Sequence, residues 1–194
     1  MTDLNRRTVL TLGAATAAAL ALPRAVFAQA DDRPEVTVAV QKVSNSNTLE
    51  MLSEQSNVGA RIYTSYAEPL IGTDWVGDMS LKPSIATSWN RIDDYTIEVE
   101  LRDDVKFHNG DLLTAEDVAF TFGPDRMWGG GTIEVPEAVI AASRRSLPAF
   151  DRVEILSPTK VRFHNSIIDP VLEGRLASAI GMVVNKRAFL ETGD

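Results

Sequence analysis

The chain has 194 residues, no cysteine and a formal net charge of −8, with 27 acidic residues against 19 Lys and Arg. Together with a hydrophobic content of 44%, this composition excludes a collagen, a disulfide-stapled scaffold and a disordered acidic tail. An acidic chain also lacks the basic face that nucleic-acid phosphates require, so no nucleic-acid partner is expected and small molecules or peptides are favoured.

The first 30 residues are typical of an export signal. Arg6 and Arg7 directly precede an uncharged apolar stretch, Leu10 to Leu22, which is too short to span a bilayer core of about 30 Å as a helix. Small residues mark possible cleavage sites after Ala28 and after Ala30. The arginine pair resembles a twin-arginine signal, with an ordinary secretory signal as the alternative. Because no cysteine is present for a lipid anchor, a soluble periplasmic protein is expected.

Strand and helix patterns alternate after this segment. Valines at every second position predict a strand over Glu35 to Val40, which a polar loop interrupts from Val43 to Thr48. Apolar residues four positions apart, beginning at Val58, predict a short helix. That helix is expected to stop at Glu68, because Pro69 cannot continue it.

The clearest strand pattern runs from Thr96 to Arg102, after a turn at Asp93-Asp94. Its apolar residues alternate with polar ones, which places the polar set, Thr96 included, toward water. A tight turn follows at Asn109-Gly110. A second hairpin is predicted over Asp151 to His164, joined by a Ser-Pro-Thr turn.

A helix is predicted to begin at Thr114 and to end at Gly123-Pro124. The Thr114 hydroxyl can accept a hydrogen bond from a free amide of the first turn, and Glu116 and Asp117 complement the positive end of the helix dipole. Helix capping therefore explains these adjacent carboxylates better than acid–base catalysis.

The chain ends with two shorter elements. A short helix is predicted after Asp169-Pro170, and Met182 to Val184 is interpreted as a buried strand. The whole pattern indicates a mixed α/β protein.

Four sequence blocks carry a family resemblance. In order along the chain they are Leu81 to Trp89, Tyr95 to Arg102, Val105 to Gly110 and Leu113 to Val118. They resemble the extracellular solute-binding proteins of family 5, the dipeptide, oligopeptide and nickel-binding receptors of ABC importers. The resemblance covers most of the chain from Val36 to Asp194.

The resemblance implies an α/β (mixed α+β) fold of the periplasmic-binding-protein type II. Members of the family are much longer, so only part of the first lobe is expected, from a fragment or a truncated gene product. The expected divisions are a signal peptide over 1–30, the start of the lobe I core over 31–66, a lobe I subdomain with two hairpins and helices over 67–178, and a truncated return to the core over 179–194.

The function implied is that of the periplasmic substrate-binding component of an ABC transporter. Such a receptor encloses a peptide or another small polar solute and presents it to permease subunits in the inner membrane. It performs no chemistry, and neither a cofactor nor a metal is expected; a full-length receptor is expected to be a monomer. Two alternatives stay open, a secreted hydrolase with catalytic residues beyond residue 194 and a solute receptor for sensing.

Candidate ligand contacts lie in two loops. The first resembles the family's first-lobe contact segment and contains Val43, Ser44, Asn45, Ser46 and Asn47, with an ordinary solvated loop as the alternative. The second contains Trp128, which either covers a ligand from a glycine-rich loop or simply packs.

Other conspicuous residues are expected to be structural. His108 and His164 are the only histidines and have no metal-ligand spacing. Gly129 to Gly131 lacks the neighbours of a phosphate loop, so a flexible loop is expected. Trp75 and Trp89 are expected to close edges of the core.

Overall fold

The structure, a computed structural model, describes residues 37, 39, 48–54 and 56–193. The predicted export-signal residues and the loop from Val43 to Asn47 lie outside the described residues, as does most of the predicted strand over Glu35 to Val40. The chain divides into two compact units, Met1–Ala39 and Val40–Asp194. All the elements below belong to the second unit.

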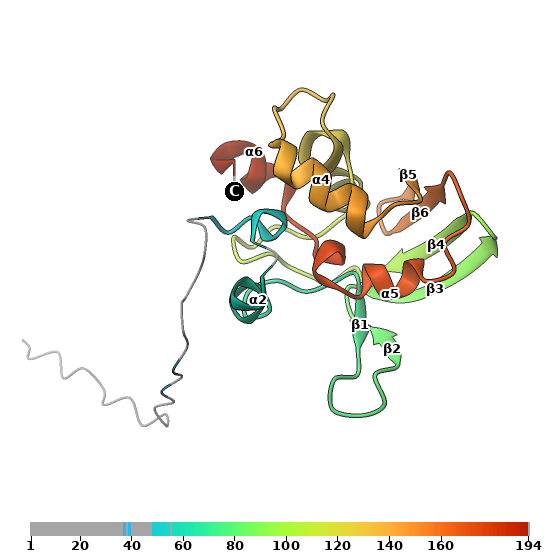
Figure 1. The fold of residues 1–194 in the computed structure, drawn as a ribbon. Coiled ribbons are helices and arrows are strands. Elements are labelled where there is room, and N and C mark those ends of the chain that lie inside the picture. Colours follow the sequence, from blue (N-terminus) through green and yellow to red (C-terminus); the bar gives the residue numbers. More distant parts are fainter. Residues whose placement is uncertain (1–36, 38, 40–47, 55, 194) are drawn as a thin grey trace, which may run out of the picture. The chain divides into compact units, whose positions relative to one another are not determined.

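Short helices and antiparallel strands alternate along this unit (Figure 1). In chain order they are η1 (Met51–Ser53), α2 (Asn57–Tyr63), β1 (Ile71–Thr73), β2 (Leu81–Pro83), β3 (Ala86–Asp93), β4 (Thr96–Leu101), α3 (Ala115–Thr121), η2 (Pro124–Trp128), α4 (Glu137–Ser146), β5 (Phe150–Ser157), β6 (Lys160–Asn165), α5 (Leu172–Leu176), η3 (Ala179–Gly181) and α6 (Lys186–Thr192).

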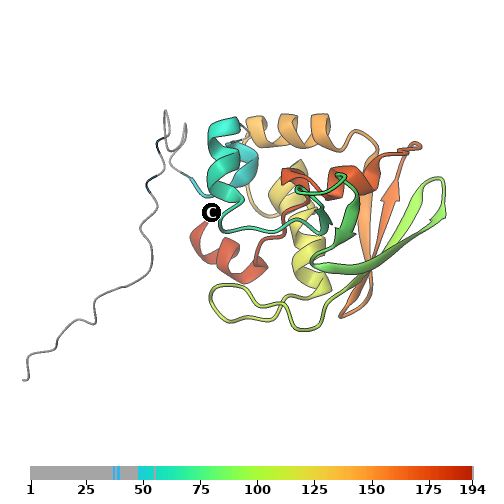
Figure 2. The ribbon, with the colours of Figure 1, turned by 90° about the horizontal axis from the view of Figure 1, so that it is seen from below.

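The strands form two antiparallel sheets. One pairs β1 with β2, and the other has four strands in the order β3-β4-β6-β5. In the larger sheet the apolar residues lie opposite one another, with Ile97 paired to Phe163 and Val99 to Val161. Their alternation with polar residues therefore creates one apolar face. Helix α3, yellow in Figure 2, packs beside this sheet and contacts β5 and β6.

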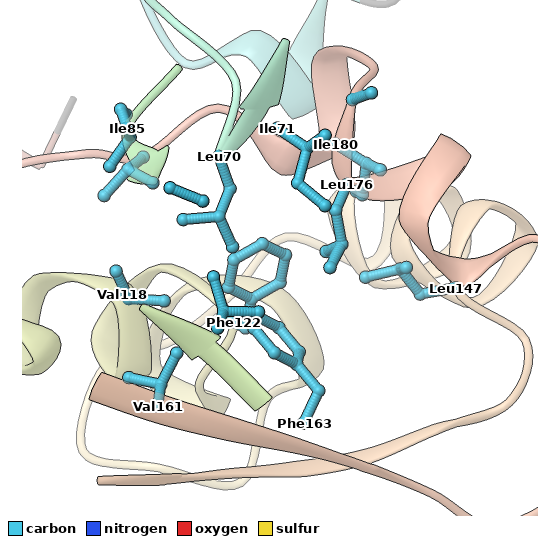
Figure 3. Close-up of a cluster of buried hydrophobic side chains, with 14 of the residues drawn as sticks. Leu70, Ile71, Ile85, Val118, Phe122, Leu147, Val161, Phe163, Leu176 and Ile180 are labelled. Atoms are coloured by element: carbon cyan, nitrogen blue, oxygen red, sulfur yellow. The ribbon is translucent and has the colours of Figure 1, made fainter. Parts of the chain in front are cut away.

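The hydrophobic core lies between the apolar face and the helices (Figure 3). Phe122, just after α3, meets Phe163 of β6 edge to face, with ring centroids 5.0 Å apart. Both rings are almost fully buried, as are Leu70 and Leu176 from the opposite side of the cluster. Burying one such side chain contributes about 1.5 to 3 kcal/mol, so this cluster holds the sheet and the helices together.

The structure confirms the predicted turn between β3 and β4 and the strand beginning at Thr96, which is β4. It also confirms the β5–β6 hairpin and the two ends of α3. Helix α2 ends earlier than predicted, at Tyr63 instead of Glu68. The Thr64 hydroxyl donates to the Ala60 carbonyl at 2.7 Å, and the Ala67 amide turns back to Tyr63 at 2.8 Å. These bonds satisfy the last carbonyls of the helix and release the chain before Pro69 is reached.

Met182 to Val184 is not a strand. Only an isolated antiparallel bridge joins Met182 to Pro69. The extended stretch is short because η3 ends directly before it and Asn185 caps α6 directly after it. Met182 and Val183 are nevertheless buried, as predicted.

Two side chains differ in exposure from the prediction. Thr96 is buried although the alternation placed it toward water; it begins an inner strand of the sheet and is paired with Asp93 of β3 and with His164 of β6. Trp75 closes no core edge, since 74% of it is exposed in the β1–β2 loop. Trp89, in contrast, packs against the core as predicted.

Candidate functional site

Trp128, a predicted ligand contact, lies at the end of the helical turn η2. Its indole N–H donates to the Phe122 carbonyl at 2.9 Å. One face of the indole stacks on Phe150, with ring centroids 5.0 Å apart and planes inclined by 7°. Trp128 is thus a fixed, half-buried apolar surface, and its only polar group already has a partner. Its indole can therefore offer a ligand a fixed apolar contact surface, but it does not move to close over the ligand.

A buried ion pair fixes the base of this turn. The guanidinium of Arg126 donates to both carboxylate oxygens of Glu50, at 3.0 and 2.8 Å, and to the Thr121 carbonyl at 3.2 Å. Arg126 is 2% exposed and Glu50 is 9% exposed. Glu50 also accepts the Leu52 amide at 2.8 Å. Charge-assisted two-point contacts of this kind set geometry as well as energy.

The ion pair brings together two segments that the sequence analysis treated separately. Glu50 follows shortly after the predicted contact loop from Val43 to Asn47, and Arg126 precedes Trp128 by two positions. The described chain beyond that loop is therefore anchored at the turn that carries Trp128. Sequence reasoning missed both charged residues. The available signal is limited to Glu50, which stands between the apolar residues Leu49 and Met51.

The glycine-rich loop after Trp128 is tied down. Asp125 accepts hydrogen bonds from the backbone amides of Thr132 and Ile133, the latter at 3.0 Å. These amides hold the pKa of the Asp125 carboxyl below its ordinary value. Gly129 and Gly130 have φ angles of 72° and 80°, which glycine adopts without strain. The loop predicted as flexible is thus a hydrogen-bonded turn.

The remaining candidates have structural partners. Asp117 accepts the Thr114 backbone amide at 2.9 Å, one half of a capping box, and its other oxygen accepts the Lys186 amide at 3.0 Å. His164 lies 2.9 Å from Glu154 on the polar face of the large sheet. His108 is exposed. Within the described residues, no group of three His, Asp or Glu side chains could hold a metal ion.

The polar face of the sheet is a network of cross-strand ion pairs. Glu98 of β4 binds Arg162 and Lys160 of β6, the latter at 2.9 Å. These cations hold the pKa of Glu98 below its ordinary value of 4.5. Arg162 also reaches Glu154 of β5 at 3.5 Å. The charges are mutually satisfied, as on a solvated face.

Comparison with known proteins gives one family. A profile described as "Bacterial extracellular solute-binding proteins, family 5 Middle" matches residues 80–192. A search of curated protein sequences finds no match. Within the described part of the chain, no helix is both long and apolar enough to cross a bilayer.

Solved structures share the fold. The PBP AgaA of A. tumefaciens R10, in complex with agropinic acid, is 19% identical with a TM-score of 0.63, over 78% of this chain and 29% of its own. The periplasmic binding protein DppA of Helicobacter pylori, in complex with the peptide STSA, is 15% identical with a TM-score of 0.61, over 77% and 31%. MoaA of A. tumefaciens R10, in complex with mannopinic acid, is 26% identical with a TM-score of 0.55, over 69% and 26%.

These matches place the mixed helix and sheet structure within the periplasmic-binding-protein fold, in part. The chain spans less than a third of the length of each of the three solved structures, 29%, 31% and 26%.

Proposed function

Because the chain belongs to family 5 of the bacterial extracellular solute-binding proteins, we propose that it forms part of the first lobe of a periplasmic receptor. That receptor binds a peptide or another small polar solute and delivers it to ABC permease subunits in the inner membrane. The profile match over residues 80–192 is the observation that carries the proposal. The complexes of similar proteins with a peptide and with mannopinic acid support a small polar solute.

The proposed solute contacts are Trp128 and the loop of Val43, Ser44, Asn45, Ser46 and Asn47. Trp128 offers a rigid apolar surface, because its indole is stacked and hydrogen-bonded from behind. The anchoring of Glu50 by Arg126 keeps the chain after the loop close to this surface. Backbone groups of the loop would then supply the polar contacts that an extended peptide needs.

The proposed location is the periplasm, reached through the twin-arginine-type signal with Arg6 and Arg7 and cleavage after Ala28 or Ala30. The family match favours binding over the secreted hydrolase considered above. In this role the described residues hold and orient the solute, and the permease and its ATPase subunits supply the energy.

Recovery of the bound solute tests the proposal. The gene is sequenced past codon 194, and the chain is produced in the periplasm together with any lobe encoded there. The purified protein is then denatured, and the released solutes are identified by mass spectrometry. Intact peptides or other small polar solutes are expected. An added tetrapeptide recovered in cleaved form would instead identify a hydrolase and contradict the proposal.

A further inference from the structure

A cavity of about 640 Å³ lies between α2, η3 and the β1–β2 loop, and Trp128 is not among its lining residues. We call it the α2–η3 cavity. Its apolar wall consists of Ala60, Ala67, Pro69, Ala177, Ala179, Ile180 and Met182. This volume lies within the range of about 300 to 1,000 Å³ that is typical of small-molecule sites, which are apolar with a few polar groups.

The polar groups of the α2–η3 cavity select a ligand by charge. Among the described residues that line the cavity, Glu68 is the only charged one. Tyr63 also lines it, is 9% exposed, and donates its hydroxyl to none of the described residues. The Ser178 hydroxyl donates to the Arg175 carbonyl at 2.7 Å, which leaves its oxygen free to accept. Arg102, outside the lining, interacts electrostatically with Glu68, but its guanidinium already donates to both carboxylate oxygens of Asp104, at 2.8 and 3.0 Å. The remaining negative charge of Glu68 favours a cationic ligand and disfavours an anion.

Trp75 forms the rim of the cavity on the β1–β2 loop. Trp75 is 74% exposed, and hydrogen bonds hold the loop that carries it. The Asp74 carboxylate accepts the Gly77 amide at 3.1 Å, and the Met79 amide donates to the Asp74 carbonyl at 3.1 Å. Met79 is held at a φ of 65°, a conformation that a non-glycine residue rarely adopts. A large apolar side chain held in water by such a turn is placed to contact a ligand.

We propose that the α2–η3 cavity binds a small organic ammonium compound with an aromatic or aliphatic body. The body fills the apolar wall, the indole of Trp75 covers it, and the ammonium group lies near Glu68. Because an indole face attracts a cation, Trp75 and Glu68 both favour a positively charged ligand. This site is separate from the proposed solute contact at Trp128, and goes beyond the receptor function.

Nuclear magnetic resonance of the ¹⁵N-labelled chain tests the proposal, with 2-phenylethylammonium as the probe. The protein has 3 tryptophans, so each indole N–H reports on one place. We expect saturable shifts of the Trp75 signal, with a Kd on the order of 1 mM for so small a ligand. The Trp89 and Trp128 signals stay unchanged. The matched anion 3-phenylpropionate is expected to bind about fivefold more weakly or less.

Two variants and a control sharpen the test. Glu68→Gln should weaken ammonium binding about two- to fivefold, whereas Glu116→Gln, an exposed carboxylate on α3, should not change it. Ala60→Leu places a larger side chain on the apolar wall and should weaken the binding that the Trp75 shifts report, while unchanged Trp89 and Trp128 signals report an intact fold. Binding that neither Ala60→Leu nor Glu68→Gln changes, equal binding of the anion, or an unshifted Trp75 signal would overturn the proposal. A peptide solute of the proposed receptor would shift the Trp128 signal and not the Trp75 signal. The receptor proposal and the cavity proposal can therefore fail or hold independently of each other.

Discussion

Arg126 and Glu50 form a two-point ion pair in the interior although 76 positions separate them in the sequence. The pair joins the start of the described fold to the turn that carries Trp128. A buried guanidinium is tolerable only while its partner remains, because desolvating an unpaired charge costs far more than the pair itself contributes.

Removing one member of this pair should therefore be strongly destabilising. Glu50→Ala is expected to lower the free energy of unfolding by about 3 to 5 kcal/mol, because it leaves a buried unpaired guanidinium. Urea denaturation measures the loss. The control is Asp104→Ala, which breaks the exposed ion pair with Arg102 and should cost about 1 kcal/mol or less. Equal losses for the two variants would show that Glu50 does not stabilise the fold through Arg126.

The start of α3 provides a second stability test. Thr114→Ala should cost about 1 kcal/mol, the usual effect of losing an N-cap. Asp117→Ala should cost more, about 1 to 3 kcal/mol, because it strands the backbone amides of Thr114 and Lys186. Glu116→Ala removes only an exposed contact with Lys186 and should stay within about 0.5 kcal/mol. An unchanged denaturation midpoint for Thr114→Ala would mean that Thr114 is not the cap.

The ion pairs on the sheet predict a loss of stability in acid. The pKa of Glu98 lies below its ordinary 4.5 in the folded protein, first because of Arg162 and then because of Lys160. The unfolded chain therefore binds a proton more readily, so this stabilisation is present above about pH 4.5 and is lost as the pH falls through the lower folded value. Urea midpoints between about pH 6 and pH 3 should fall less steeply for Glu98→Gln than for the unchanged protein. Parallel pH profiles would contradict this role.

Patterns in the sequence predicted those elements whose hydrogen bonds join residues close together in the chain. The alternation after Thr96 located β4, and the Thr114 cap located α3, because hairpins and helix starts are determined by neighbouring residues. The family resemblance rested on blocks within the same region and is confirmed.

Distant contacts decided what the sequence did not predict. Met182 to Val184 has one bridge partner, Pro69, which lies 113 positions before Met182. The pairing of Glu50 with Arg126 links two segments with no shared local pattern. Contacts of this kind depend on how the elements pack, which periodicity does not encode.

Export offers a test of the proposed location. Replacing Arg6 and Arg7 with lysines should leave uncleaved precursor in the cytoplasm, because a twin-arginine route recognises guanidinium groups and not positive charge alone. Immunoblots of cytoplasmic and periplasmic fractions measure the distribution. An undiminished amount of mature periplasmic protein would identify an ordinary secretory signal instead.

Calorimetric titration with peptides tests the central claim most directly, that residues 31–194 form part of one lobe of a two-lobed solute receptor. A solute touched on one face loses most of the contacts that an enclosing pocket supplies. Residues 31–194 alone are therefore expected to show no saturable peptide binding at micromolar concentrations, and binding should appear when a second lobe encoded downstream is joined to them. A well-folded monomer of residues 31–194 that binds peptide with micromolar affinity or better would contradict the account.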